Sequence, residues 1–330
     1  MRRRTALMSA SAVLAMSLLG ACASEADSPT PSEQSASASA SAAAIEPAVT
    51  DEELPVDVAG EVGTAVKPTV TFTPPLTVSE TSRKVVVPGD GPEVAATDTI
   101  AFAYTLYAGS TGEELDSNYG RTAARFELSN ITMGLARGFV GTHVGDRVVI
   151  AIAPDDGFGE AVQQFGKENV DATTTIVVVA DVEKIVPTMA EGTPVTPPAG
   201  LPTVVTDEGN VPTGFEIADP TPPADLVVQP LIEGTGPAVT PGMNLTVQYL
   251  GARLADGEVF DQSWTRPEPF EFVIGQGNVI PGWDNGLVGQ KIGSRVELVI
   301  PAEQAYGEEP SNPSAPAGAL VFVVDVLDGY

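Results

Sequence analysis

The last third of the chain alternates apolar and polar residues over several short segments. Every second residue is apolar in 245–249, 296–300 and 320–326. A period of two is typical of β-strands that bury one face. Residues 255–258, Ala-Asp-Gly-Glu, have the composition of a hairpin turn. The pattern therefore predicts an antiparallel sheet.

The same region has one good helix candidate, residues 282–288, directly after Pro281. Trp283 and Leu287 lie four positions apart, so they share one face of that helix. A sheet that wraps over one short helix is an α+β arrangement.

The pattern occurs twice in the chain. Residues 145–150, Gly-Asp-Arg-Val-Val-Ile, match 293–298, Gly-Ser-Arg-Val-Glu-Leu. Further matched pairs lie 144 to 148 residues apart: Tyr104 with Tyr249, Asp116 with Asp261, Phe126 with Phe270 and Phe158 with Tyr306. This spacing is far above the roughly 20–50 residues of solenoid repeats. We therefore expect two copies of one domain.

The length of 330 residues also favours two domains of about 100–150 residues each. We place them at 67–186 and 225–330. The Pro-rich connector between them, 187–224, is expected to be extended and semi-rigid. Within it, residues 214–217 are apolar enough to add a short strand to a neighbouring domain.

The N-terminus has the three regions of a secretory signal peptide. Arg2, Arg3 and Arg4 precede an apolar run over 6–19, which is shorter than the ~20 residues that span a bilayer. Residues 19–22, Leu-Gly-Ala-Cys, resemble the lipobox of bacterial lipoproteins. The resemblance implies cleavage after residue 21, diacylation of Cys22 and a lipid anchor at the outer face of the cytoplasmic membrane. An ordinary cleavage site with an incidental cysteine is the alternative.

Residues 22–66 are rich in Ser, Ala, Pro and acidic residues and show no periodicity. Such a segment has too little apolar surface to offset the entropy of ordering. We expect a disordered tether that holds the domains away from the membrane.

Charge and cysteine content exclude several classes of function. The net charge is −28; removal of Arg2, Arg3 and Arg4 from 16 basic residues leaves 13 against 44 acidic ones, or −31. Such a chain repels phosphate backbones, so nucleic acid is not an expected partner. One Cys and one His supply too few ligands for a structural zinc site, and a disulfide within the chain is impossible.

Aromatic and branched apolar residues recur in order through residues 225–330. The series runs Tyr249, Phe260-Asp261, Phe270-Glu-Phe272, Val279-Ile-Pro-Gly-Trp283, Tyr306-Gly307 and Phe322. It resembles the FKBP-type peptidyl-prolyl cis-trans isomerases over this whole segment without large gaps. The resemblance implies a half-barrel of five or six antiparallel strands curled around one short helix. Residues 67–186 are then a second FKBP-like domain.

The implied reaction is rotation about a peptide bond, which must break amide resonance worth about 18–20 kcal/mol. It needs no nucleophile, metal or cofactor. An apolar, water-poor cavity disfavours the charge-separated resonance form, and a few polar contacts hold the twisted amide. X–Pro bonds are the natural substrate, because their cis form costs only about 0.5–1 kcal/mol.

The resemblance also implies a role for each pocket residue. Trp283 is the floor under the proline ring. The N–H of Ile280 and the hydroxyl of Tyr306 donate hydrogen bonds to a bound peptide or to macrolides such as tacrolimus or rapamycin. Asp261 faces the amide carbonyl, beside Phe260 at the rim, and Arg266 orders it. The walls are Tyr249, Phe270, Phe272, Val279 and Phe322. The alternative for each aromatic is plain core packing.

Two features depart from the family pattern. Residues 311–318, before the last strand, are small and polar where bulky apolar residues are usual, so we expect a less apolar lip and weaker macrolide binding. Glu308 and Glu309 beside it would disfavour acidic peptides. The first domain has lost several pocket residues and is expected to have weak or no activity. Its replacements are Leu135 for Trp283, Leu115 for Phe260, Phe158 for Tyr306 and Leu128 for Phe272.

We therefore expect a lipid-anchored, extracytoplasmic prolyl isomerase that acts on exported, proline-containing polypeptides. Two alternatives stay open. The pocket could hold proline peptides without turnover, as a holdase chaperone does, or the first domain could serve as an interaction scaffold in the cell envelope.

Overall fold

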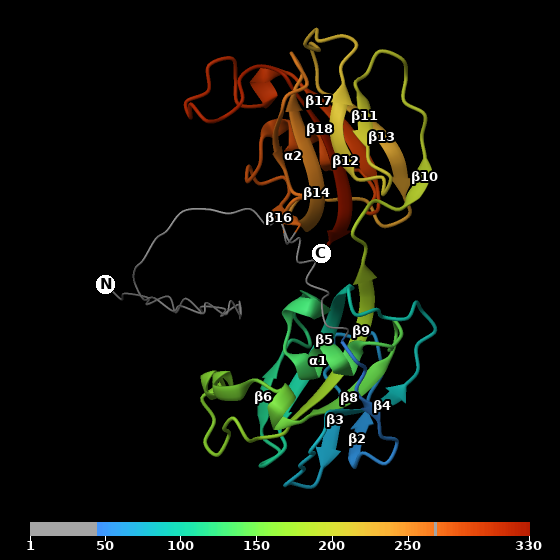
Figure 1. The fold of residues 1–330 in the computed structure, drawn as a ribbon, viewed down its shortest axis with the longest axis vertical. Coiled ribbons are helices and arrows are strands. Elements are labelled where there is room, and N and C mark those ends of the chain that lie inside the picture. Colours follow the sequence, from blue (N-terminus) through green and yellow to red (C-terminus); the bar gives the residue numbers. More distant parts are fainter. Residues whose placement is uncertain (1–44, 267–268) are drawn as a thin grey trace, which may run out of the picture.

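The computed structural model describes residues 45–266 and 269–330, which form two domains of the same architecture (Figure 1). The first is a seven-stranded sheet in which β1 pairs parallel to β4 and every other pair is antiparallel. Its order is β1 (Val49–Thr50), β4 (Ser82–Val87), β8 (Arg147–Ile152), β9 (Ile176–Val186), β5 (Thr99–Ala108) and β6 (Glu114–Ser117), with β7 (Ala124–Glu127) also on β5.

The second domain repeats this order with an antiparallel sheet of seven strands. Its order is β10 (Gly192–Pro194), β13 (Val227–Gly234), β17 (Arg295–Ile300), β18 (Leu320–Gly329), β14 (Asn244–Arg253) and β15 (Val259–Gln262), with β16 (Phe270–Val273) also on β14. The predicted α+β class and the internal duplication are confirmed.

One short α-helix lies against each sheet, α1 (Met133–Phe139) and α2 (Pro281–Leu287). The predicted helix at 282–288 begins one residue earlier, because Pro281 occupies its first turn. A Cβ atom on Gly282 would lie 2.5 Å from a methyl carbon of Ile300, so only glycine lets the helix approach the sheet this closely. Short 3₁₀ turns complete the domains: η1 (Leu128–Asn130), η2 (Pro154–Asp156), η3 (Gly159–Phe165) and η4 (Ala302–Gln304).

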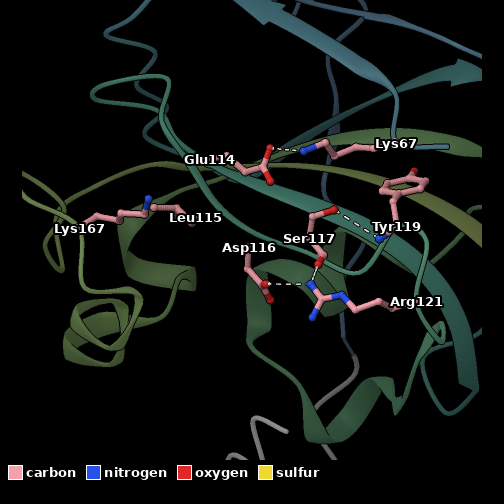
Figure 2. A pocket seen from close by; sticks show the side chains of 8 residues that line it. All are labelled: Lys67, Glu114, Leu115, Asp116, Ser117, Tyr119, Arg121 and Lys167. Carbon is pink, nitrogen blue, oxygen red and sulfur yellow. Dashed lines mark hydrogen bonds and ion pairs between the residues drawn. The ribbon is translucent and has the colours of Figure 1, made fainter. Parts of the chain in front are cut away.

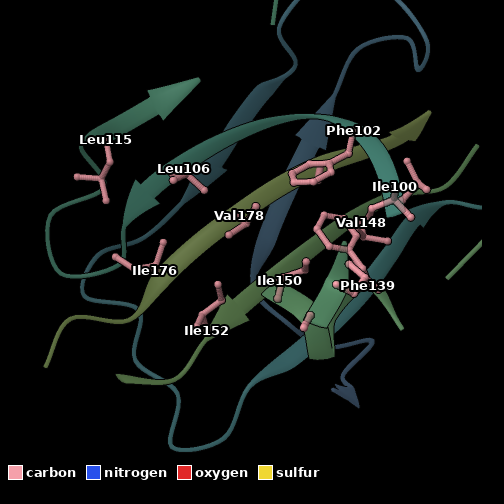
Figure 3. Packing of buried hydrophobic residues seen from close by; sticks show 14 of the residues in the cluster. Ile100, Phe102, Leu106, Leu115, Phe139, Val148, Ile150, Ile152, Ile176 and Val178 are labelled. Atoms are coloured by element: carbon pink, nitrogen blue, oxygen red, sulfur yellow. The ribbon is translucent and has the colours of Figure 1, made fainter. Parts of the chain in front are cut away.

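Each domain has its main core between the helix and the concave face of the sheet. In the first domain Phe102 and Phe139 pack with Ile150 and Val178 (Figure 3). In the second domain Trp283 and Leu287 pack on Leu298 and Val324. The period-two residues found in the sequence supply the sheet side of both cores.

A hairpin covers the outer face of the first sheet, made of β2 (Val56–Ala59) and β3 (Thr69–Phe72). Leu54 and Val56 are buried there against Val149 and Val179. The predicted tether over 22–66 was therefore wrong for residues 45–66. Three apolar residues with period two, Leu54, Val56 and Val58, are enough for one buried strand face, although the acidic, Pro-containing segment around them is typical of disorder.

A second hairpin covers the outer face of the second sheet, made of β11 (Thr203–Thr206) and β12 (Pro212–Glu216). Phe215 and Ile217 pack on Val299 and Val321. The short strand expected near 214–217 is present, and β10 joins the second sheet. Much of the predicted connector 187–224 is thus part of the second domain.

The two domains meet through Asp328 at the end of β18. Its buried carboxylate forms ion pairs with Arg125 of β7, at 2.8 Å from Nε, and with Lys184 of β9. The Arg125 guanidinium also lies 3.6 Å from the centre of the Tyr330 ring. These contacts join β7 and β9 of the first domain to β18 of the second.

The predicted signal peptide, Cys22 and the first part of the tether lie outside the described residues. Within 45–266 and 269–330, no helix has the length and apolar character needed to cross a membrane.

Candidate functional site

A cluster of aromatic side chains fills the concave side of the second domain. Trp283 of α2 lies at its centre and is only 4% exposed. Its ring centroid is 5.2 Å from that of Tyr249 and 5.3 Å from that of Phe322, both in edge-to-face geometry that aromatic pairs prefer. Phe270 and Phe272 complete the cluster from β16. Trp283 therefore forms the base of an aromatic box.

Strand register explains why these residues converge. Phe322 of β18 lies opposite Gly251 of β14, two residues after Tyr249. A Cβ atom on Gly251 would lie 2.4 Å from the Phe322 ring and 3.0 Å from the Phe260 ring. The glycine therefore makes room for both rings, whose centroids are 5.6 Å apart. Gly251 was not singled out from the sequence.

One polar network lies at the edge of the box. The Tyr249 hydroxyl donates a hydrogen bond to Asp261, and Arg266 donates both to Asp261 and to the Tyr249 oxygen, the latter at 3.1 Å. Burial, followed by the hydrogen bond to Asp261, raises the pKa of Tyr249 to about 12. Tyr249 therefore stays a donor at neutral pH and fixes the orientation of the Asp261 carboxylate.

The two expected peptide donors also flank the box. Ile280 directly precedes α2, and its carbonyl accepts from the N–H of Trp283 at 2.9 Å. Its own N–H has no acceptor within the described ranges. Tyr306 follows η4 and is 44% exposed. Burial, and then the charge of Asp261, raise the pKa of Tyr306, so its hydroxyl remains protonated.

The loop that carries Val279 and Ile280 is held by a residue missed in the sequence. Asp284 accepts hydrogen bonds from the N–H of Gly275 at 2.7 Å and of Gly277 at 2.8 Å. Both glycines have positive φ, +74° and +73°. Two glycines spaced by one residue, ahead of an acid in the first helical turn, are the sequence signal that could have pointed to it.

The structure thus brings all the predicted pocket residues to one side of the second domain. Val279 and Ile280 pack against the same core as Phe260 and Phe270. Their roles toward a ligand stay predictions.

The first domain keeps part of this arrangement. Tyr104 donates to Asp116 at 2.7 Å, but Arg121 is 3.8 Å from that carboxylate. A cavity of about 100 Å³ remains beside them. Its lining comes from both sheet and helix: Phe102, Tyr104, Leu106, Asp116, Phe126, Asn130, Ile131, Thr132, Leu135, Phe158 and Phe165.

The sequence match of Phe126 with Phe270, and of Leu128 with Phe272, was wrong. Phe126 pairs with Ile100 in the first sheet, and Phe272 pairs with Leu245, the counterpart of Ile100. Phe126 therefore corresponds to Phe272, and Ala124 to Phe270. The strand register gives an offset of 146 residues (272 − 126) in place of 144. Apolar character alone does not fix the register, because Phe270 and Phe272 are both apolar.

Comparisons with known proteins show the family that this chain belongs to. The family model described as FKBP-type peptidyl-prolyl cis-trans isomerase matches residues 91–193 and 236–327, more than half of the chain. An FK506-binding protein of Streptomyces anulatus is 44% identical over 108 residues, which cover 32% of this chain and 87% of that protein.

Two further matches also cover about one domain of this chain. The peptidyl-prolyl cis-trans isomerase FKBP15-2 of Arabidopsis thaliana is 47% identical over 87 residues, 26% of this chain and 53% of that protein. The crystal structure of AtFKBP13 aligns at 30% identity and a TM-score of 0.30, over 34% of this chain and 98% of that one.

Proposed function

Because this chain belongs to the family of FKBP-type peptidyl-prolyl cis-trans isomerases, we propose that its C-terminal domain carries the isomerase site. Both domains are FKBP-like, so the family alone does not choose between them. The observation that favours the second domain is its complete aromatic box around Trp283, joined to the Tyr249–Asp261–Arg266 network.

The chemistry follows from the surroundings of a bound X–Pro bond. The proline ring rests on Trp283, and the aromatic walls exclude water from the amide. A peptide bond that leaves water loses stabilisation of its charge-separated resonance form, which lowers the barrier to rotation. The reaction makes and breaks no covalent bond, so the site needs only to bind the twisted amide better than the planar one.

Three polar groups position the substrate in this proposal. The Ile280 N–H and the Tyr306 hydroxyl donate to carbonyl oxygens of the peptide. Asp261, held by Tyr249 and Arg266, lies beside the carbonyl that rotates out of conjugation. Such fixed dipoles need no rearrangement during the reaction.

The test is protease-coupled isomerisation of a Leu–Pro tetrapeptide by the full chain and by Trp283→Leu, which installs the residue of the first domain. We expect kcat/KM to fall by at least tenfold. The matched variant Leu135→Ala in the first domain should leave it within twofold. Loss of turnover in Leu135→Ala instead would move the site to the first domain. Peptide binding without turnover in the unaltered chain would favour the holdase function.

We further propose that the site also binds macrolides of the tacrolimus type, more weakly than its relatives do. Support comes from the name of the Streptomyces relative and from the small, polar residues at 311–318. Tacrolimus should inhibit turnover, and Trp283→Leu should weaken that inhibition.

The proposed location is the outer face of the cytoplasmic membrane, with exported proline-containing proteins as substrates. It rests on the signal-like residues 1–21 and the lipobox ending in Cys22. Cys22→Ser should move the protein from the membrane fraction to the soluble fraction after export. Unchanged membrane retention of that variant would contradict the lipid anchor.

A further inference from the structure

The first domain keeps an apolar cavity although its helix lacks a tryptophan. Leu135 is smaller than Trp283, and the missing bulk is replaced from the sheet side. Phe102 occupies the position of Val247, and its ring centroid lies 4.6 Å from that of Phe139. Phe158 and Phe165 close another side in edge-to-face contact at 5.7 Å. The cavity is therefore rebuilt with different residues rather than filled.

An open groove of about 550 Å³ adjoins this cavity, and Asp116 lines both. Figure 2 shows three cations along the groove, Lys67, Arg121 and Lys167. Leu115 and Tyr119 also line the groove. An extended peptide with one side chain in the cavity would therefore place its neighbouring side chains among these cations.

The equivalent rim of the second domain has fewer cations: Arg266 beside Asp261 is the counterpart of Arg121 beside Asp116. The segment 302–330, which follows β17 and carries Tyr306, contains no Lys or Arg but has Glu303, Glu308 and Glu309. The corresponding segment of the first domain carries Lys167. Glu114, Asp116 and Glu113 pair with the three cations of the groove, so the mouth is locally neutral in a chain of net charge −28.

The cations are paired, but their partners are exchangeable. Lys67 contacts Glu114 at 2.6 Å, and their side chains are 42% and 38% exposed. Lys167 contacts Glu113 at 2.8 Å, also at the surface. Exposed ion pairs contribute little net stability, because water and salt screen them. A carboxylate of an incoming peptide can therefore take the place of Glu113 or Glu114.

We propose that the first domain is a second peptide-binding site, selective for an apolar side chain flanked by acidic residues, with or without proline. The cavity binds the apolar side chain, and Lys67, Arg121 and Lys167 bind the carboxylates. The loss of the Tyr306 hydroxyl, replaced by Phe158, removes a donor that an X–Pro substrate would use. This site binds extended segments and does not turn them over.

The experiment uses the full chain and two fluorescein-labelled, proline-free peptides, Gly-Glu-Leu-Leu-Glu-Gly and its twin with Lys for Glu. Fluorescence anisotropy should give at least tenfold tighter binding of the acidic peptide, weakened by added salt. Lys67→Glu and Lys167→Glu should each weaken it at least threefold. Leu135→Trp, which fills the cavity, should abolish it.

The matched control is Lys291→Glu. Lys291 is a similarly exposed cation of the second domain, paired with Glu233 at 2.7 Å, and it lines neither the groove nor the cavity of the first domain. It should leave binding unchanged. Equal affinity for the two peptides would overturn the proposal, as would the same loss in Lys291→Glu. Binding that survives Leu135→Trp but is lost in Trp283→Leu would assign the peptide to the second domain and also overturn it.

Discussion

Arg295 and Asp325 form a two-point ion pair inside the second sheet. Arg295 Nε lies 2.6 Å from Oδ1 and Nη2 lies 2.8 Å from Oδ2 of Asp325. The remaining guanidinium nitrogen of Arg295, Nη1, donates a hydrogen bond to the carbonyl of Asn210 at the tip of the β11–β12 hairpin. Arg147 and Asp181 repeat the pair in the first domain, where Arg147 donates to the carbonyls of Gly60 and Glu61. The duplicated ion pair therefore holds each covering hairpin to its sheet.

Asp325→Asn should destabilise the second domain strongly. It leaves the buried Arg295 guanidinium without a counter-charge, which typically costs about 3–5 kcal/mol. Both tryptophans, Trp264 and Trp283, lie in this domain, so tryptophan fluorescence during urea unfolding reports on it alone. Asp256→Asn is the control, because its pair with Arg253 is exposed and screened by water, so its loss should change the urea midpoint little. Equal losses in the two variants would contradict the structural role.

Glu297→Gln should stabilise the second domain at neutral pH. The Glu297 side chain is buried at 1% exposure, and neither oxygen has a partner among the described residues. Burial raises its pKa to about 7 from 4.5. The folded state therefore keeps a proton that the unfolded state loses, so stability falls as the pH rises from about 4.5 to 7, by roughly 3 kcal/mol.

The measurement is the urea midpoint between pH 5 and pH 8. Glu297→Gln should remove most of the decline over this range. Glu297→Val, which copies Val149 of the first domain, should do the same and add apolar packing under the hairpin. A pH dependence that both variants share with the unaltered chain would exclude Glu297 as its source.

Tyr306→Phe should lower isomerase activity without affecting stability. The side chain is 44% exposed, and Phe158 shows that the fold accepts the change. Loss of one hydrogen bond to the substrate corresponds to about 0.5–1.5 kcal/mol, or roughly two- to tenfold in kcat/KM. The reverse variant Phe158→Tyr is the control and should leave turnover unchanged. An unaltered kcat/KM in Tyr306→Phe would remove this hydroxyl from the proposed mechanism.

Gly282→Ala should destabilise the second domain by about 1–3 kcal/mol, because the added methyl group overlaps the Ile300 side chain. Gly289→Ala tests backbone strain alone. Its new Cβ would have no atoms within 4 Å, but the backbone φ at this position is +88°, which favours glycine. Unfolding midpoints that are unchanged in Gly282→Ala would contradict the close approach of α2 to β17.

Much of this fold could be predicted from the sequence, because its strands follow period two and the repeat doubles each signal. The ordered aromatic series also named the residues that the structure gathers around Trp283, whose roles toward a ligand stay predictions. Close approaches between elements were not predictable. Gly251 and Gly282 are required because a Cβ atom at either position would overlap a neighbouring side chain, and the sequence does not show which side chains are neighbours. Strand pairing was not predictable either, as the assignment of Phe126 shows. The hairpin strand at 56–59 was missed because its period-two pattern consists of only three apolar residues, Leu54, Val56 and Val58, within an acidic segment.

The central claim, that turnover belongs to the second domain, is tested most directly by a matched pair of variants in the full chain. Asp116→Ala and Asp261→Ala each remove the carboxylate that accepts a hydrogen bond from the equivalent tyrosine, Tyr104 in the first domain and Tyr249 in the second. In protease-coupled isomerisation of a Leu–Pro peptide, we predict that kcat/KM falls at least tenfold in Asp261→Ala and stays within twofold in Asp116→Ala. Equal losses in both variants, or a loss in Asp116→Ala alone, would contradict it.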